Sequence, residues 1–438
     1  MWVYLWWKTG FLSGPPVNAS RYTHFSFLPC GWIAANYQSM AKNANLSQAK
    51  SAKKDEFYTQ YADIQMEVNA YLEYNPDVFR GKTILLPCDD PEWSNFTRFF
   101  AENFELFGLK KLISTSFAVE SKNSNLYEPT LFETEAPNFD EAKTRTHGKI
   151  FILERDVNNS GRIDLDDLQW EYMEGDGDFR SKEVCALRDE ADIIITNPPF
   201  SLFREFVAWI FEAHKKFLII GNQNAITYKE IFPLIKNNLM WTGKRFNRRV
   251  NGDNMTFMVP DDYPMKGTEL YMEDGKKYIS VAGTGWFTNI DHGRRHQPLQ
   301  LMTMEDNIKY SKHKEVKGVG YQKYDNYDAI EVPFSDAIPS DYEGIMGVPI
   351  SFMDKYCPEQ FEILGATQRE CHDDVPDTKK YDDYWECKPN GEKTGSSGGK
   401  TNENANLLKN DGLHNYFENA EGRQIQSAYQ RIFIRKKQ

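Results

Sequence analysis

The tetrapeptide Asn197-Pro198-Pro199-Phe200 follows an apolar run at 193–195 and directly precedes a helical pattern. Proline is excluded from helix interiors and from central strands, so a buried strand has to end at this point. In an open parallel sheet, ligands bind beyond the carboxyl ends of the strands. The tetrapeptide therefore lies where a reaction site is expected.

These four residues suit the methylation of an amino group that is conjugated to a ring or a carbonyl. Such a nitrogen is a poor nucleophile because its lone pair is delocalised. The side-chain oxygen of Asn197 and the backbone carbonyl of Pro198 could accept its hydrogens, localise the lone pair and offset the positive charge that grows during attack on a sulfonium methyl. Pro199 stiffens the turn, and Phe200 could stack on a base extruded from a duplex. The alternative is a turn that ends a strand and caps a helix.

A methyl donor needs acceptors for its polar groups, and two other segments offer them. The glycine-free segment CDDPEWSNF carries Asp89 and Asp90, which could serve an ammonium, a sulfonium or a ribose diol. The alternative is that Asp90 only caps a helix. Further along, Asp178 and Phe179 could hold an adenine ring by its amino group and its face, although by spacing alone such a segment is more often a plain loop.

The pattern around these segments predicts an α/β fold. Short apolar runs predict buried strands at 82–87, 110–116, 149–153, 192–196 and 216–221. Helices are expected at 91–107, with Asp90 as N-cap and Gly108 just past the end, and at 202–213. Buried strands that alternate with helices indicate a doubly wound, mostly parallel sheet covered on both faces. The segments 255–260 and 277–290 suit antiparallel strands at one edge of that sheet.

Composition limits the class of protein. The net charge of −12 disfavours a polyanionic partner for the chain as a whole, but local basic clusters could face phosphates as readily as solvent, namely 243–249, 292–296 and 431–437. Six scattered cysteines without a C-x-x-C pair exclude a zinc module or a disulfide framework and indicate a reducing cytoplasm. The segment 156–167 fits a calcium-loop register but follows a predicted strand and ends in Asp, so we favour a polar hairpin and expect no metal.

Changes in composition along the chain predict its division. We expect 1–39, which is aromatic and loop-like, to be a poorly ordered tail or a misassigned start. Residues 40–300 would form the catalytic domain. Residues 301–438, rich in Tyr, Pro and Gly, would form a second, irregular domain in which 387–406 is a mobile loop.

Several segments together resemble the EcoRI-type adenine-specific DNA methyltransferase family, in the order DEFYTQYADI, CDDPEWSNF, GDGDFRS, DIIITNPPFSLFREF, GWFTNIDHGRR and YQRIFIRKK. The resemblance runs from about Met40 to the C-terminus. It implies a Rossmann-like, class I enzyme that uses S-adenosylmethionine to methylate N6 of a flipped-out adenine in double-stranded DNA. It also implies that 301–438 is an α+β target-recognition domain.

The resemblance also implies roles for single residues. Tyr58 and Thr59 match the segment that contacts the methionine part of the cofactor in amino-methyltransferases. Asp178 and Phe179 match the place where the cofactor adenine is held, and the tetrapeptide at 197–200 matches the catalytic motif. No acidic residue after LISTS obviously replaces the usual ribose ligand.

Other functions remain open at this point. Cytosine N4, RNA adenine and protein glutamine are methylated by enzymes with similar tetrapeptides, and a DNA-binding pseudoenzyme is an alternative of a different class. The expected partner is duplex DNA, with no membrane. We expect a cytoplasmic monomer that serves restriction-modification, with a cognate endonuclease acting separately, or orphan marking of DNA.

Overall fold

The structure, a computed structural model, describes the chain in ten segments: 58–91, 94–118, 138–154, 170–244, 255–259, 270–273, 275–281, 283–367, 375–428 and 430–437. The expectations for 1–39 and for the calcium-like segment 156–167 lie outside these residues. None of the described helices is both long and apolar enough to cross a membrane.

In the described part of the chain, the main sheet has eight strands in the order β5-β4-β3-β2-β6-β7-β12-β8. All five predicted strands are confirmed, and 284–288 is the expected antiparallel strand. The bounds are β2 Thr83–Leu86, β3 Lys111–Thr115, β4 Lys149–Leu153, β5 Trp170–Tyr172, β6 Ile193–Thr196, β7 Lys216–Asn222, β8 Trp241–Thr242 and β12 Thr284–Thr288.

The sheet is mixed, not mostly parallel. The pairings among the central strands β3, β2, β6 and β7 are parallel, whereas β4, β5, β12 and β8 pair antiparallel. Burial matches this difference on one flank: β2 and β6 are buried at every position, whereas β4 alternates and exposes Ile152, as is typical of an antiparallel strand with one face toward solvent. On the other flank, the antiparallel β12 is buried at all five positions.

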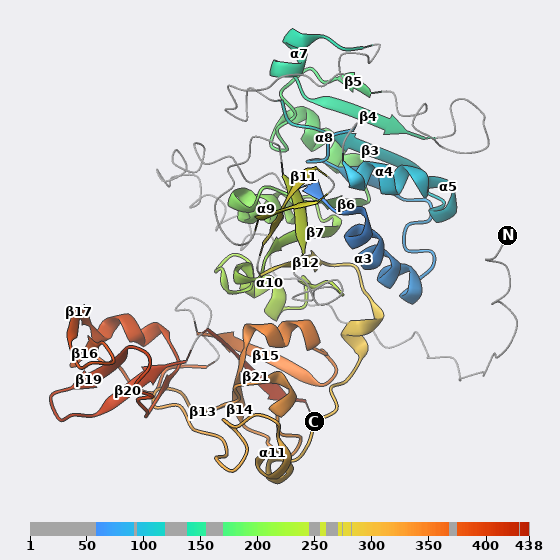
Figure 1. Cartoon of the computed structure of the whole chain (residues 1–438). Helices are drawn as coiled ribbons and strands as arrows, with labels where there is room; N and C mark the ends of the chain where they lie inside the picture. The colour runs from blue at the N-terminus through green and yellow to red at the C-terminus, as the bar shows by residue number, and fades with distance from the viewer. Residues whose placement is uncertain are drawn as a thin grey trace, which may run out of the picture. The chain divides into compact units, whose positions relative to one another are not determined.

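Helices cover both faces of this sheet, as expected. Successive residues of β6 point into different hydrophobic clusters: Ile194 into the α9-side core, with Phe206 and Phe217, and Ile193 into the α4-side core, with Phe100. In Figure 1, α3, α4 and α5 lie on one side of β6 and β7, and α9 and α10 on the other. The bounds are α3 Tyr61–Tyr74, α4 Asn95–Glu102, α5 Phe104–Phe107, α7 Glu141–Thr146, α8 Lys182–Glu190, α9 Phe203–Glu212 and α10 Phe232–Lys236.

The helix predicted at 91–107 is shorter than expected and divided. It begins at Asn95 and not at Pro91, because the backbone N–H of Ser94 donates to Asp90 in a separate turn and the Ser94 hydroxyl caps the helix. A break at Asn103 separates α4 from α5, and Gly108 follows in the left-handed region with φ 62°. The predicted apolar stripe is confirmed for its described members Phe96, Phe100, Phe104 and Phe107, all of which are buried.

A small antiparallel sheet stands apart from the main one. It has the order β1-β9-β11-β10, with β1 Tyr58–Thr59, β9 Thr256–Val259, β10 Leu270–Glu273 and β11 Lys276–Ser280. The prediction that 255–260 and 277–280 extend the edge of the main sheet is therefore wrong. Strand β9 pairs with β1, a segment distant in sequence, and β11 pairs with β9 and β10; local patterns do not encode the pairing of β9 with β1.

The C-terminal part contains two further sheets, in the orders β13-β14-β21-β15 and β17-β16-β19-β20-β18. The predicted mobile loop 387–406 instead folds into β17 and a 3-10 helix, because Thr401 is buried and binds Asn406. The bounds are α11 Met304–Tyr310, β13 Ala329–Glu331, β14 Ile345–Pro349, β15 Phe361–Ala366, β16 Tyr384–Cys387, β17 Lys393–Ser397, β18 Asn406–Leu407, β19 Tyr416–Asn419, β20 Gln424–Ser427 and β21 Arg431–Lys436.

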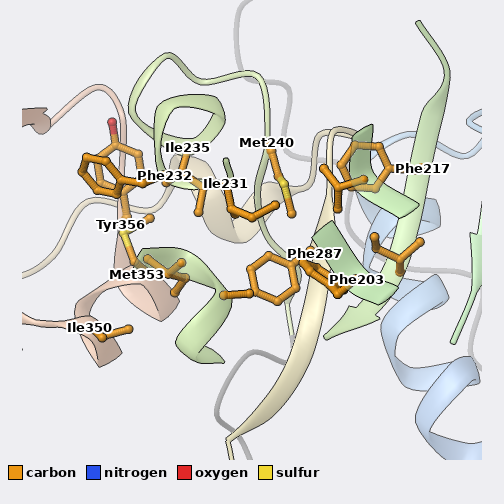
Figure 2. Packing of buried hydrophobic residues seen from close by; sticks show 14 of the residues in the cluster. Phe203, Phe217, Ile231, Phe232, Ile235, Met240, Phe287, Ile350, Met353 and Tyr356 are labelled. Carbon is orange, nitrogen blue, oxygen red and sulfur yellow. The ribbon is translucent and has the colours of Figure 1, made fainter. Parts of the chain in front are cut away.

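The α9-side core continues from the main sheet into the C-terminal part. Figure 2 shows Met353 and Tyr356 beside Phe232 of α10, with Phe287 of β12 further along the same cluster. Polar contacts join the same two parts: Arg294 pairs with Asp354. The expected division at residue 300 stays a prediction, and the packing shows that the two parts share one core.

Candidate active site at the strand ends

The tetrapeptide lies where the sequence predicts, at the carboxyl end of β6. The strand ends at Thr196, and the 3-10 helix Phe200–Leu202 leads into α9. Pro198 is buried, as is the side-chain oxygen of Asn197. Phe200 is half-buried and packs against the α4-side core. Both proposed hydrogen-bond acceptors and the aromatic ring therefore gather at one strand end.

Asp89 joins the ends of three strands. It follows β2, its backbone N–H donates to the carbonyl of Thr115 at the end of β3, and its Oδ2 accepts from the hydroxyl of Thr196 at 2.6 Å. Its Oδ1 accepts from the hydroxyl of Ser94 at 2.7 Å. The side chain is only 5% exposed. Burial raises the pKa of Asp89 from its ordinary 3.8 to about 7, against the lowering effect of the two hydroxyl donors.

Thr59 is tied to the same region. Its backbone carbonyl accepts from the side-chain amide of Asn95 at 2.8 Å, and Asn95 is the first residue of α4, next to Ser94. The hydroxyl oxygen of Thr59 is buried and has no hydrogen-bond partner among the described residues. For Tyr58, only the backbone is described, paired with Met258. A continuous set of contacts thus runs from Thr59 through α4 and Asp89 to the strand end that carries Asn197.

The two aspartates after β2 differ in accessibility. Both carboxylate oxygens of Asp89 are engaged by hydroxyls within the protein. Asp90 is half-buried, and its backbone carbonyl receives the N–H of Ser94 at 2.9 Å. Of the two side chains, that of Asp90 is the more exposed. Asp90 is not the N-cap of α4, which is Ser94.

Asp178 and Phe179 lie in the loop that follows β5. This loop reaches the end of β3, where Ala118 donates to Asp176 and where Gly177, at φ 78°, comes so close that a Cβ would lie 2.0 Å from the carbonyl oxygen of Ser116. The segment thus meets the same edge of the sheet as the tetrapeptide. Glycine is required here both for its conformation and for its lack of a side chain.

The side chains of this pair face different surroundings. The carboxylate of Asp178 is 21% exposed and forms a salt bridge with Arg180 at 2.6 Å. The ring of Phe179 is 5% exposed and packs edge-on against Phe206 and Trp209 in the α9-side core. A stacking contact between Phe179 and an adenine would have to use the small exposed part of the ring.

Several residues of this region were not predicted from the sequence. Thr196 and Ser94 hold the carboxylate of Asp89, and the hydroxyl of Ser114 donates to the carbonyl of Asp89 at 2.6 Å. A hydroxyl residue at the end of each neighbouring strand is the signal that could have pointed to them. Among the described residues, no group of His, Cys, Asp and Glu side chains has the arrangement of a metal site.

Arginines of two of the three basic clusters, 292–296 and 431–437, form contacts within the protein. Arg294 pairs with Asp354, and Arg295 lies over the ring of Trp241 at 3.9 Å. In the cluster 431–437, Arg431 forms a buried ion pair with Glu331. These arginines hold parts of the chain together, so a phosphate-facing role is not supported for them. Most of the remaining cluster, 243–249, lies outside the described residues.

Comparison with known proteins gives a consistent set of matches. A family model described as adenine-specific methyltransferase EcoRI matches residues 45–437. The Type II methyltransferase M.EcoRI of Escherichia coli is 43% identical over 329 residues, which cover 74% of this chain and 90% of that protein. The Type II methyltransferase M.MpnI of Mycoplasma pneumoniae is 35% identical over 321 residues, covering 73% of this chain and 84% of that protein. No solved structure matches.

Proposed function

This chain belongs to the EcoRI family of adenine-specific methyltransferases, and we propose that it transfers a methyl group from S-adenosylmethionine to N6 of a flipped-out adenine at a specific site in duplex DNA. The observation that carries the proposal is the tetrapeptide at the end of β6, with the side-chain oxygen of Asn197 buried beside Pro198. The parallel strands β3, β2, β6 and β7, with the tetrapeptide at the carboxyl end of β6, support our proposal of a Rossmann-like, class I arrangement.

The residues around the strand ends fit S-adenosylmethionine, which supplies an electrophilic methyl group when bound. The molecule brings hydrogen-bond donors: an ammonium, ribose hydroxyls and an adenine amino group. The hydroxyl oxygen of Thr59, buried and without a hydrogen-bond partner among the described residues, is an acceptor at this place, and Asp90 adds a half-buried carboxylate. Thr59 with Tyr58 would meet the methionine part, Asp90 the ammonium or the ribose, and Asp178 with Phe179 the adenine.

In this proposal, the tetrapeptide activates the target nitrogen. Asn197 Oδ1 and the carbonyl of Pro198 accept hydrogen bonds from N6, which localises its lone pair and stabilises the charge that develops there. Phe200 stacks on the extruded base, and Pro199 holds the turn. The transfer would be direct: as N6 bonds to the methyl carbon, the carbon–sulfur bond of the donor would break and S-adenosylhomocysteine would leave. The methylated nitrogen would then be acidic enough to release a proton to water, so no strong general base is required.

The C-terminal part is assigned to target recognition. In this proposal, 40–300 catalyse the reaction and 301–438 read the DNA, with the shared α9-side core setting the position of one against the other. The relatives are Type II methyltransferases, which supports a restriction-modification setting in the cytoplasm. The enzyme would act as a monomer, and a cognate endonuclease would act separately.

Expression in a methylation-free host, followed by modified-base sequencing, tests the reaction, the base and the target site together. We expect N6-methyladenine at one sequence for the wild type and none for Asn197→Ala. Asn237→Ala is the matched control, because that amide only binds the carbonyl of Pro233 at an exposed helix end. An unmarked genome with the wild type, or a mark that survives in Asn197→Ala, would refute the proposal. A tritium-transfer assay with DNA, RNA and protein as substrates separates the alternative acceptors.

A further inference from the structure

The ladder of hydrogen bonds that supports β6 on its β2 side stops short of the tetrapeptide. Strand β6 pairs with β7 as far as Thr196, but its pairing with β2 ends at Leu85 and Ile194. Beyond that pair, β2 continues to Leu86, paired only with β3, and the loop that carries Asp89 follows. The hydrogen bond from the Thr196 hydroxyl to Asp89 bridges the two strands at this point.

We propose that Asp89 is a positioning residue for the methyl transfer, which acts by holding Thr196, and therefore Asn197, and not by contacting S-adenosylmethionine. This inference rests on the proposed function. Both carboxylate oxygens are engaged, one by Thr196 and one by Ser94, and the side chain is 5% exposed. Each oxygen is already held by a hydroxyl of the protein, and burial leaves the carboxylate little exposed surface with which to meet a ligand.

The carboxylate connects the cofactor side of the site to its catalytic side. Ser94, which donates to Asp89, also caps α4 by accepting from the N–H of Phe96, and the next residue, Asn95, binds Thr59. Thr196, on the other side, is the residue directly before Asn197. A displacement of the first turn of α4 would therefore also move the end of β6, because the side chain of Asp89 is bound to both.

Positioning matters because the two acceptors act only when they meet the amino hydrogens in the correct geometry. A misplacement of roughly 1 Å costs on the order of 100-fold in rate. The Thr196 contact, at 2.6 Å, has the length of a hydrogen bond from a hydroxyl to an ionised carboxylate. Such a bond is stronger than a neutral one, so the ionised form of Asp89 holds the strand end more firmly.

The charge of the methyl donor favours that ionised form. The pKa of Asp89 is raised to about 7, with burial as the main cause; within that balance the hydroxyls of Thr196 and Ser94 lower the pKa, and the neighbouring carboxylate of Asp90 raises it. A bound cation near Asp90 opposes the last effect and lowers the pKa of Asp89. The tetrapeptide is then held most firmly when the methyl donor is in place.

Thr196→Val and Thr196→Ser test the contact, with Thr288→Val as control. Thr288 is also a buried threonine at a strand end, where it donates to the carbonyl of Phe217 at 2.7 Å, away from the tetrapeptide. We expect Thr196→Val to lower kcat on the order of 10- to 100-fold, with the Kd of S-adenosylhomocysteine, measured by calorimetry, within about twofold. Thr196→Ser restores kcat to within about threefold, and Thr288→Val lowers the thermal midpoint without changing kcat.

The pH dependence of kcat distinguishes a positioning role of Asp89 in the reaction from a role in folding alone. In the wild type, kcat at saturating S-adenosylmethionine should fall as pH drops, because Asp89 takes up a proton. In Asp89→Asn, kcat should be low at every pH and should not show this fall. Unchanged kcat in Thr196→Val would overturn the inference, as would a loss of S-adenosylhomocysteine binding in Asp89→Asn with kcat retained. If the wild type methylates no substrate, the proposed function fails instead. Should Thr196→Val not fold, Thr196→Ser and Asp89→Asn still decide the question.

Discussion

The side-chain amide of Asn95 donates a hydrogen bond to the backbone carbonyl of Thr59 at 2.8 Å. This contact docks the two-residue strand β1 against the first turn of α4, the helix whose N-cap also binds Asp89. It holds Thr59, whose hydroxyl oxygen is buried, at the start of that helix. In the proposed enzyme, the contact sets where the methionine part of the cofactor is held.

Asn95→Ala is expected to weaken cofactor binding and to leave the chemical step intact. A hydrogen bond of this type contributes about 1 kcal/mol, so the Kd of S-adenosylhomocysteine should rise roughly fivefold, with kcat at saturation within about twofold. Asn103→Ala is the control, because its amide binds the carbonyl of Phe99 at the other end of the helix. Equal Kd values for Asn95→Ala and the wild type would contradict the placement of Thr59.

Asp178→Ala is expected to cost more affinity. The carboxylate is held in place by Arg180, which also reaches Glu205 on α9 at 3.2 Å. A hydrogen bond to a charged group contributes about 1.5–3 kcal/mol, so the Kd of S-adenosylhomocysteine should rise on the order of 10- to 100-fold. Glu205→Gln keeps Arg180 on Asp178 and should change the Kd less than threefold by the same reasoning. Calorimetry on both variants checks this, and a small effect of Asp178→Ala would remove the residue from the cofactor site.

The sequence was informative where residues close together in the chain determine the structure. Two prolines after an apolar run force a strand to end, and the tetrapeptide at 197–200 indeed follows β6. Continuous apolar runs also located β2, β3, β6 and β7. The family resemblance, carried by short motifs in order, is confirmed by the family match over 45–437.

The sequence was uninformative where partners distant in the chain decide. Asp89 and Thr196 are 107 residues apart, and no local pattern shows that they share a hydrogen bond. The start of α4 was misplaced for a local reason: the backbone N–H of Ser94 closes a turn on Asp90, and Ser94 caps the helix instead. The polar segment 387–406 has the composition of a loop, but the side chain of the distant Asn326 binds the backbone of Asn404 and Asn406 within it.

Removing Arg431 is expected to destabilise the C-terminal part strongly. Its Nη2 lies 2.6 Å from Oε1 of Glu331, both side chains are buried, and Tyr324 also donates to Glu331. Arg431→Met leaves an uncompensated buried carboxylate, which costs about 3–5 kcal/mol of unfolding free energy. In the double variant with Glu331→Gln, more than half of that loss should return, as urea titrations can show. Additive losses would indicate that the two groups do not form the pair described.

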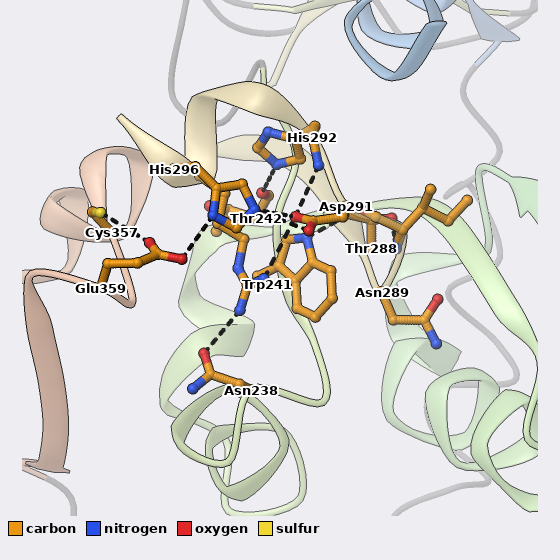
Figure 3. Close-up of polar contacts among 12 residues, drawn as sticks. Asn238, Trp241, Thr242, Thr288, Asn289, Asp291, His292, His296, Cys357 and Glu359 are labelled. Carbon is orange, nitrogen blue, oxygen red and sulfur yellow. Dashed lines mark hydrogen bonds and ion pairs between the residues drawn. The ribbon is translucent and has the colours of Figure 1, made fainter. Parts of the chain in front are cut away.

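A pH-dependent contribution to stability is expected from His296. Figure 3 shows His296 between Asp291 and Glu359: its Nε2 lies 2.9 Å from a carboxylate oxygen of Asp291, and its Nδ1 lies 2.8 Å from Glu359 Oε1. Partial burial alone would lower the pKa of His296, but the two hydrogen-bonded carboxylates outweigh it and hold the pKa above its usual 6.5. The folded protein therefore binds this proton more tightly than the unfolded chain does.

A histidine whose pKa is raised on folding contributes stability that is fully present below its unfolded pKa and is lost as pH rises through the folded one. The difference in urea midpoint between the wild type and His296→Gln should thus be larger at about pH 6 than at about pH 9. Arg295, which also lies near Asp291, keeps its charge throughout and cannot cause this change. Because the pair is partly exposed, added salt should reduce the difference at low pH. A difference that stays constant across the range would show that His296 is not charged between its two partners.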